Sequence, residues 1–134
     1  MRLLLDTNVI SDFVKGERGV LARLRAEPKE AVAISVVTAM EIEYGLRLNP
    51  ARARRIEAVL QALLESIPVI PYEIEDARAT ASVRASLRKA GKPIGPYDSM
   101  IAGTALRHGL ILVTANADEF ERVGGLSVEN WRGS

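Results

Sequence analysis

The sequence of 134 residues contains no cysteine and only one histidine, His108. The lack of cysteine excludes disulfide scaffolds, thiol nucleophiles and cysteine-ligated zinc sites. A single histidine also excludes every site that needs two imidazoles, including acid–base catalysis by a histidine pair. The side chains that remain for demanding chemistry are carboxylates, whose oxygens favour hard cations such as Mg²⁺ or Mn²⁺.

Long apolar runs and a strong charge imbalance are also missing. No apolar stretch approaches the roughly 18 residues that a membrane span requires, and Asp6 interrupts the apolar N-terminus before it could form a signal peptide. The 18 lysines and arginines nearly balance the 17 acidic residues, which gives a net charge of +1. The composition predicts one cytoplasmic globular domain over residues 1–134, although a balanced sum can hide local patches of charge.

Short apolar runs alternate with helical patterns along the chain. We expect strands at residues 3–5, 31–35, 67–71, 110–113 and 126–131, and helices at 9–15, 17–25, 38–48, 51–65, 74–90 and 98–108. The prolines in 67–71 favour an edge position for that strand. Because the strands are continuous apolar runs separated by helices, they predict an α/β fold with a parallel sheet covered on both faces.

Polar residues follow the predicted strands at the edge where such sheets bind ligands. Asp6 follows the first strand, Glu41 lies near the start of the helix after the second, Asp98 opens the helix before the fourth, and Asn116 follows Val113. Three converging carboxylates would repel one another unless a cation lay between them. Such a cluster is typical of a Mg²⁺ site that is open to a substrate phosphate.

Each of these residues also has a purely structural interpretation. The alternatives are a capping box for Thr38 and Glu41, an N-cap for Asp98, a helix-initiating turn for Asp6, and local caps for Asn116 and Asp118. Basic residues likewise form either a nucleic-acid surface or a solvated helix face: Arg52, Arg54 and Arg55 in one cluster, and Arg78, Arg84, Arg88, Lys89 and Lys92 in another. The joint placement of the acidic residues, rather than any single one, supports the cation site.

Five blocks of the sequence resemble the PIN-domain ribonucleases, specifically the VapC-type toxins of toxin–antitoxin pairs. The blocks are LLDTNVIS at 4–11, SVVTAMEIEYG at 35–45, DSMIA at 98–102, VTANADEF at 113–120 and VENW at 128–131. They span nearly the whole chain in the order and spacing of the family. The resemblance implies a Rossmann-like arrangement of about five strands.

The resemblance also implies roles for individual residues. Asp6, Glu41 and Asp98 would bind Mg²⁺ or Mn²⁺, and the family's fourth position falls on Asn116, which adds no charge. Asp118 is an alternative for that fourth position. Three further residues are implied to support the site: Thr114, together with Thr7 and Asn8, which would orient the turn at Asp6.

The activity implied is metal-assisted hydrolysis of RNA phosphodiester bonds, leaving 5′-phosphate and 3′-hydroxyl ends, by a toxin that blocks translation or growth. Such a route needs neither histidine nor cysteine. The implied partners are a VapB-like antitoxin, the RNA substrate and a second copy of the chain, without a membrane. An apolar surplus on the early helices predicts the protein–protein surfaces: Val14, Val20, Leu21, Leu24, Ile42 and Leu46.

Two other functions compete with this interpretation. Phosphoryl transfer through an aspartyl phosphate would use Asp6, but haloacid-dehalogenase-like phosphatases carry a second aspartate where this chain has Asn8. A PIN-fold module that binds RNA or protein with weak or no catalysis is the other alternative, and Asn116 favours it. The RNA target cannot be predicted, because recognition of RNA shape leaves no legible code in the sequence.

Overall fold

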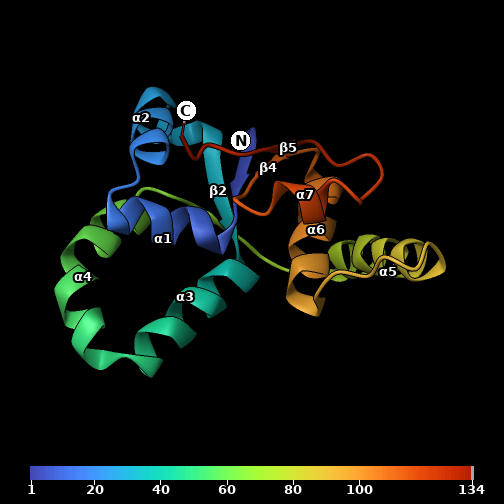
Figure 1. Cartoon of the computed structure of the whole chain (residues 1–134), viewed down its shortest axis with the longest axis horizontal. Coiled ribbons are helices and arrows are strands. Elements are labelled where there is room, and N and C mark those ends of the chain that lie inside the picture. Colours follow the sequence, from blue (N-terminus) through green and yellow to red (C-terminus); the bar gives the residue numbers. More distant parts are fainter. Residues whose placement is uncertain (134) are drawn as a thin grey trace.

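The computed structural model describes residues 1–133. Within them, five parallel strands form one sheet in the order β3-β2-β1-β4-β5 (Figure 1). The strands are β1 (Leu3–Leu5), β2 (Val32–Ser35), β3 (Val69–Ile70), β4 (Ile111–Val113) and β5 (Val128–Glu129). The predicted parallel sheet is confirmed, and the proline-flanked β3 lies at an edge as expected. The N-terminal β1 is central, so the residue that follows it reaches the middle of the sheet edge.

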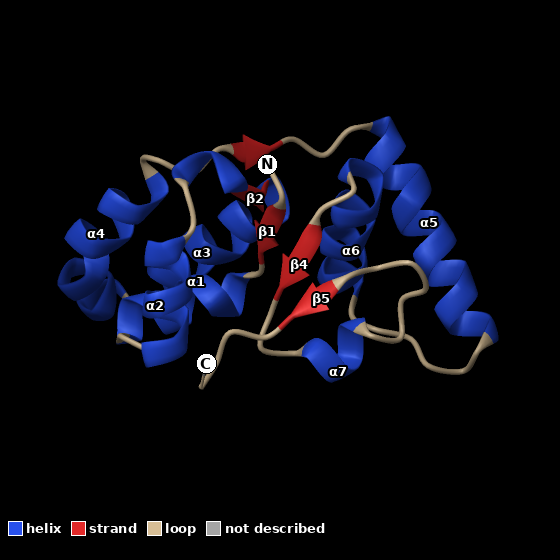
Figure 2. Ribbon diagram, turned by 90° about the horizontal axis from the view of Figure 1, so that it is seen from above, coloured by secondary structure: helices blue, strands red, loops and turns tan. Residues whose placement is uncertain are grey.

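Helices cover both faces of the sheet, as predicted. They are α1 (Thr7–Lys15), α2 (Arg18–Ala26), α3 (Val36–Leu48), α4 (Pro50–Leu64), α5 (Ile74–Lys89), α6 (Pro96–His108) and the short α7 (Ala117–Phe120), with a 3₁₀ turn at Lys29–Ala31. Helices α1, α2 and α4 lie on one side of the sheet, and α5 and α6 lie on the other (Figure 2). The sequence did not predict α7, whose single turn is too short to show a periodic apolar pattern.

Alternation along the strands builds two hydrophobic cores. Leu3 and Leu5 point to the core shared with α1, α2 and α4, whereas Leu4 points to the core shared with α5 and α6. All three leucines are fully buried. Because successive side chains of a strand face opposite sides, an apolar residue is required at every position of β1. This requirement explains the unbroken run of leucines at the start of the sequence.

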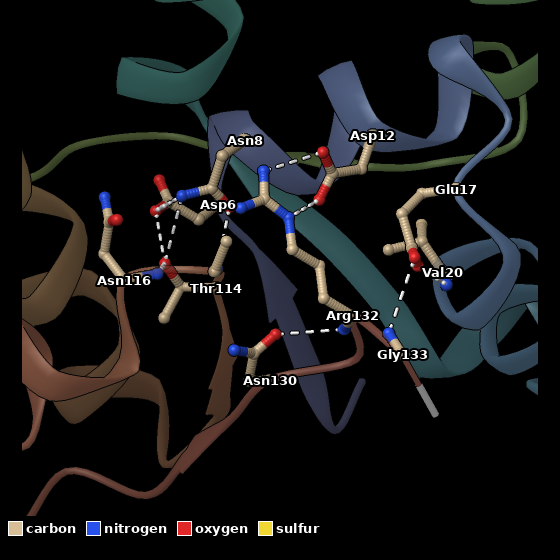
Figure 3. A network of polar contacts seen from close by, with 11 residues as sticks. Asp6, Asn8, Asp12, Glu17, Val20, Thr114, Asn116, Asn130, Arg132 and Gly133 are labelled. Atoms are coloured by element: carbon tan, nitrogen blue, oxygen red, sulfur yellow. Dashed lines mark hydrogen bonds and ion pairs between the residues drawn. The ribbon is translucent and has the colours of Figure 1, made fainter.

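Side-chain contacts hold the C-terminal segment against α1 and α2. The guanidinium of Arg132 donates two hydrogen bonds to Asp12 on α1, from Nε to Oδ2 at 2.7 Å and from Nη2 to Oδ1 at 2.9 Å (Figure 3). The guanidinium of Arg23 on α2 stacks over Trp131, with its carbon 5.1 Å from the ring centre. The Trp131 side chain is almost fully buried. These contacts hold the chain end against the core that α1 and α2 share.

The structure changes the interpretation of the apolar surplus on the early helices. Val20 is buried in the core, while Val14, Leu24, Ile42 and Leu46 are partly buried against it. These side chains pack against the core inside the molecule, although Ile42 and Leu46 on α3 also line a cavity between α3 and α4. The large apolar side chains that do remain exposed on α3 form one stripe at a spacing of four residues: Val36, Met40, Tyr44 and Leu48. Within residues 1–133, no helix has the length and apolar character needed to cross a membrane.

Candidate active site

Asp6 lies at the carboxyl end of the central strand and is only 3% exposed. It is the N-cap of α1, and its Oδ1 accepts a hydrogen bond from the Thr7 backbone N–H at 2.8 Å. Its Oδ2 accepts hydrogen bonds from the Thr114 hydroxyl at 2.8 Å and from the Asn8 amide at 3.2 Å (Figure 3). All these donors are neutral, so they orient the carboxylate without cancelling its charge.

The turns after β1 and β4 are linked by hydrogen bonds. The side-chain oxygen of Asn8 accepts from the Ala115 backbone N–H at 3.0 Å, and the Asp6 backbone N–H donates to the Val113 carbonyl at 2.9 Å. The Thr114 hydroxyl oxygen accepts from the Asn116 backbone N–H at 3.0 Å. The network fixes the position of Asp6 from both adjacent strands, and it brings together the residues that the sequence analysis assigned supporting roles.

Glu41 lies on α3 and faces the turn at Asp6. Its Oε1 accepts a hydrogen bond from the Thr7 hydroxyl at 2.7 Å. The capping-box interpretation of Glu41 is wrong, because α3 begins two residues earlier than predicted. Ser35 is the N-cap, and its hydroxyl oxygen accepts from the Thr38 backbone N–H at 3.1 Å. Glu41 therefore lies beyond the first turn, where it has no cap to complete.

Asp98 lies in the first turn of α6, and the prediction that it caps this helix is wrong. The helix begins at Pro96 after the N-cap Gly95, since proline is well suited to a first helical position. Burial raises the pKa of Asp98 to about 6, with further contributions from the negative charges of Asp6, Glu119 and Glu41. The carboxyl group is thus in an acidic environment that it shares with residues from α3, α7 and the end of β1.

Glu119 is the acidic neighbour that the sequence analysis missed. Its side chain and its charge contribute to the raised pKa of Asp98, and its charge also raises the pKa of Asp6. Glu119 is partly buried in the single turn of α7, whereas Asp118, considered earlier as the fourth acid, is exposed. Because α7 begins just after Asn116, Asp118 and Glu119 lie on different faces of its single turn. The sequence does not reveal this helix, since four residues are too few to show a periodic pattern.

The raised pKa of Asp6 has the same origin as that of Asp98. Burial is the largest cause and outweighs the hydrogen bonds from Thr114 and Thr7, while the charges of Glu41 and Glu119 raise the pKa further. Within residues 1–133, none of these four carboxylates forms an ion pair with lysine, arginine or histidine. Four acidic side chains without a basic partner form a strongly negative site at one end of the sheet.

A hard divalent cation fits this site by ligand type and by charge, since carboxylate oxygens are the ligands it prefers. Across residues 1–133, no three acidic or histidine side chains are already arranged as a complete metal-binding group. Glu41 is hydrogen-bonded to Thr7 instead, as expected for like charges that repel one another. Holding one cation would therefore require side-chain rotations at Glu41 and its acidic neighbours. Asn116 is exposed, and its backbone rather than its side chain makes contacts in the described part of the chain.

Known proteins resemble this chain in sequence over nearly their whole length. The family model described as PIN domain matches residues 3–126. The tRNA(fMet)-specific endonuclease VapC of Shigella flexneri is 38% identical over 131 residues, covering 98% of both chains. The VapC ribonuclease Y4jK of Sinorhizobium fredii is 36% identical over 138 residues, covering 96% of this chain and 97% of the relative.

Solved structures give the same result. A chain in the crystal structure of DNA-bound VapBC from Salmonella typhimurium matches with a TM-score of 0.88 at 35% identity, covering 98% of both chains. The structure of FitAcB from Neisseria gonorrhoeae matches with a TM-score of 0.85 at 29% identity, covering 96% of each chain. Together with the sequence relatives, these matches show that the chain belongs to the PIN-domain family.

Proposed function

We propose that this chain is a divalent-cation-dependent endoribonuclease that acts as the toxin of a toxin–antitoxin pair. The observation that supports it most directly is the group of buried and half-buried carboxylates at the sheet edge that lacks any basic partner. Relatives of similar length carry the names endonuclease and ribonuclease. An acidic site of this kind cannot bind a phosphodiester by itself, so a cation is needed to join the two.

The residues we propose to hold Mg²⁺ or Mn²⁺ are Asp6, Glu41 and Asp98. We propose Glu119 for the fourth acidic position in place of Asn116 or Asp118, because Glu119 interacts with both Asp98 and Asp6. A bound cation supplies a water of lowered pKa and neutralises charge that develops on the phosphoryl oxygens. With its pKa at about 6, Asp98 is mostly ionised at neutral pH and can therefore act as a ligand.

The other residues of the site position these carboxylates. The Thr114 hydroxyl and the Asn8 amide both donate to Oδ2 of Asp6. These hydrogen bonds fix the orientation of the Asp6 carboxylate. The Thr7 hydroxyl connects the Asp6 turn to Glu41 and sets the spacing between the first and second acidic residues. No general base other than water or a carboxylate is required, in agreement with the absence of cysteine and the single histidine.

We propose a VapB-like antitoxin and a second copy of the chain as partners, in the cytoplasm. The support is that similar solved structures are described as VapBC complexes. Two apolar surfaces remain for partners after folding: the exposed stripe on α3 from Val36 to Leu48, and a cavity of about 540 Å³ between α3 and α4 lined by Ile42, Leu46 and Leu60. Both surfaces lie on the same half of the molecule as Glu41.

Hydrolysis of an unstructured RNA by the purified chain tests the proposal. We expect cleavage with Mg²⁺ or Mn²⁺ that leaves 5′-phosphate ends and stops when EDTA is added. Replacing the ligand in the variant Asp98→Asn should lower the rate by a factor of roughly 100 or more, while circular dichroism remains that of the folded chain. Undiminished cleavage in EDTA, or by pure Asp98→Asn, would show the assignment to be wrong.

The non-catalytic alternative loses its main support in this structure. Asn116 favoured it because the asparagine removes a charge from the expected fourth position. Glu119 supplies an acidic group beside Asp98 from the same short segment. The phosphatase alternative is also disfavoured, because the chain belongs to the PIN-domain family.

A further inference from the structure

A second groove, basic rather than acidic, runs along α5 next to the carboxylate site. It has a volume of about 500 Å³. Its principal lining residues are Arg84, Leu87, Arg88, Pro93, Ile94 and Ser99. The floor is apolar and the two charged groups are both arginines, so within residues 1–133 the lining contains no carboxylate. The groove therefore combines positive charge with a surface suited to flat or apolar groups.

The groove lies next to Asp98, because the residue that follows Asp98 in the chain, Ser99, lines it. Ser99, which lines the groove, donates from its hydroxyl to the Gly95 carbonyl at 3.0 Å. A Cβ built on Gly95 would lie 3.7 Å from Oδ2 of Asp98. Pro93 and Ile94 of the loop from Lys92 to Gly95 line the basic groove, and Gly95 at its end lies beside the carboxyl group of Asp98. A chain molecule lying in the groove would therefore have a proposed catalytic residue as a close neighbour.

The arginines of this groove are free to contact a ligand. Arg84 and Arg88 are exposed, lie on one face of α5 at a spacing of four residues, and form no ion pair within the part of the chain described. On the same helix, Arg78 is paired with Glu75 at 2.6 Å. The loop that forms the opposite wall is held by Arg122, whose Nη1 donates to the Pro93 carbonyl at 3.3 Å.

We propose that this groove binds the phosphate backbone of the RNA strand beside the bond that is cleaved. The inference rests on the proposed function and adds the residues that anchor its substrate. A polyanion is repelled by the acidic site, so a neighbouring positive surface is needed to hold it there. Arginine binds phosphate with two parallel hydrogen bonds, and Ile94 and Pro93 offer an apolar surface to a ribose or base.

The alternative occupant is an acidic segment of a protein partner. RNA is favoured because the groove lies beside Asp98, where the proposed reaction places a phosphodiester. An acidic protein segment takes no part in that reaction, so the position of the groove gives it no advantage. The two occupants are separated by the experiment below.

The test compares the double variant Arg84→Gln/Arg88→Gln with a matched control, Arg18→Gln/Arg25→Gln. The control removes the same charge from exposed arginines of α2 that do not line the groove. Binding of a short fluorescent single-stranded RNA is measured by anisotropy in EDTA, where cleavage does not interfere. We expect the groove variant to bind about tenfold more weakly, and the slope of log affinity against log salt to fall by about 1.4, the value for two lost phosphate contacts on a single strand. The control should change affinity by less than about twofold.

Equal losses in both double variants would overturn the proposal, because general charge would then explain the binding. So would unchanged RNA affinity in the groove variant together with lost affinity for a polyglutamate peptide, which would assign the groove to an acidic protein segment. In a parallel cleavage assay with Mg²⁺, we expect the groove variant to raise KM and leave kcat within about twofold. If the wild-type chain binds RNA through the groove and never cleaves it, the proposed function fails while this inference stands.

Discussion

Asp6 and Asp12 belong to the same short stretch of chain, and both are almost completely buried, at 3% and 5% exposure. Their surroundings are opposite (Figure 3). Asp12 is held by two hydrogen bonds from the guanidinium of Arg132. Asp6 receives only neutral donors and faces the charges of Glu41 and Glu119. One buried carboxylate is thus neutralised within the fold, and the other is not.

The energetic consequence appears in the pKa values of the two regions. Asp12 raises the pKa of Arg132, because the pair stabilises the charged guanidinium. Burial raises the pKa of Asp6, because no positive group offsets the loss of water around its carboxylate. Arg107 forms the same kind of pair with buried Asp76, with its Nη1 2.9 Å from Oδ2 of Asp76. Among the buried carboxylates of residues 1–133, Asp12 and Asp76 are each paired with an arginine, whereas Asp6 is not and is the one available to a ligand.

Apart from the ligand variant Asp98→Asn, the largest effect on activity should come from Glu119, which belongs to the unpaired group. We expect Glu119→Gln to lower RNA hydrolysis by a factor of about 30, because the side chain adds charge beside Asp98 and Asp6. The matched control is Asp118→Asn, one residue away on the exposed side of α7, which should change the rate by less than about twofold. The measurement is initial cleavage rate at several Mg²⁺ concentrations. A larger loss in the Asp118 variant would restore that residue to the fourth position.

In the paired group, we expect the variant Arg132→Ala to lower the free energy of unfolding by about 1.5 kcal/mol. The substitution leaves Asp12 buried without its partner, and the cost is reduced because the Arg132 side chain is 52% exposed. The matched control is Arg47→Ala, which breaks an exposed pair with Glu43 on α3 and should change stability by less than about 0.5 kcal/mol. Urea unfolding measures both. Equal stabilities for the two variants would show that the pair with buried Asp12 contributes no more than an exposed pair does.

The parallel sheet and most helices could be predicted because their signals are local. The leucines of β1 form an unbroken apolar run, and the prolines beside β3 indicated its edge position. Helix starts were less accurate, because they depend on which of several polar residues becomes the cap. Ser35 and Gly95 took that role in place of Thr38 and Asp98. With the observed helix starts, Glu41 lies beyond the first turn of α3, and Asp98 lies within the first turn of α6.

Of the four acidic residues that we propose for the site, the sequence indicated three and missed Glu119. Asp6 directly follows the apolar run of β1, and Glu41 and Asp98 lie in long helices that can be recognised from the sequence. Glu119 lies on one helical turn, where a shift of one residue exchanges it with Asp118. The pairing of Asp12 with Arg132 could not be predicted either, because the two residues are far apart in the chain and no local pattern links them.

The smallest expected effect, about 1 kcal/mol in the free energy of unfolding, comes from the charge of Asp98 in the unpaired group. The folded-state pKa of Asp98, about 6, is higher than its ordinary value of 3.8. Between these values the folded chain binds more protons at Asp98 than the unfolded chain does. Stability conferred by the neutral form is therefore lost as the pH rises from about 4 to about 6. In EDTA at about pH 7.5, Asp98→Asn should unfold at a higher urea concentration than the wild type.

The size of this gain is limited because Asp98 is only partly buried and water screens its neighbours. The advantage of Asp98→Asn should shrink as the pH is lowered toward about 4, where the wild-type carboxyl is neutral as well. Added Mg²⁺ should stabilise the wild type more than the variant, because only the wild type has a charged ligand at this position. A wild type that is more stable than Asp98→Asn in EDTA at neutral pH would contradict this prediction, because neither burial nor the acidic neighbours of Asp98 would then impose a cost on its charged form.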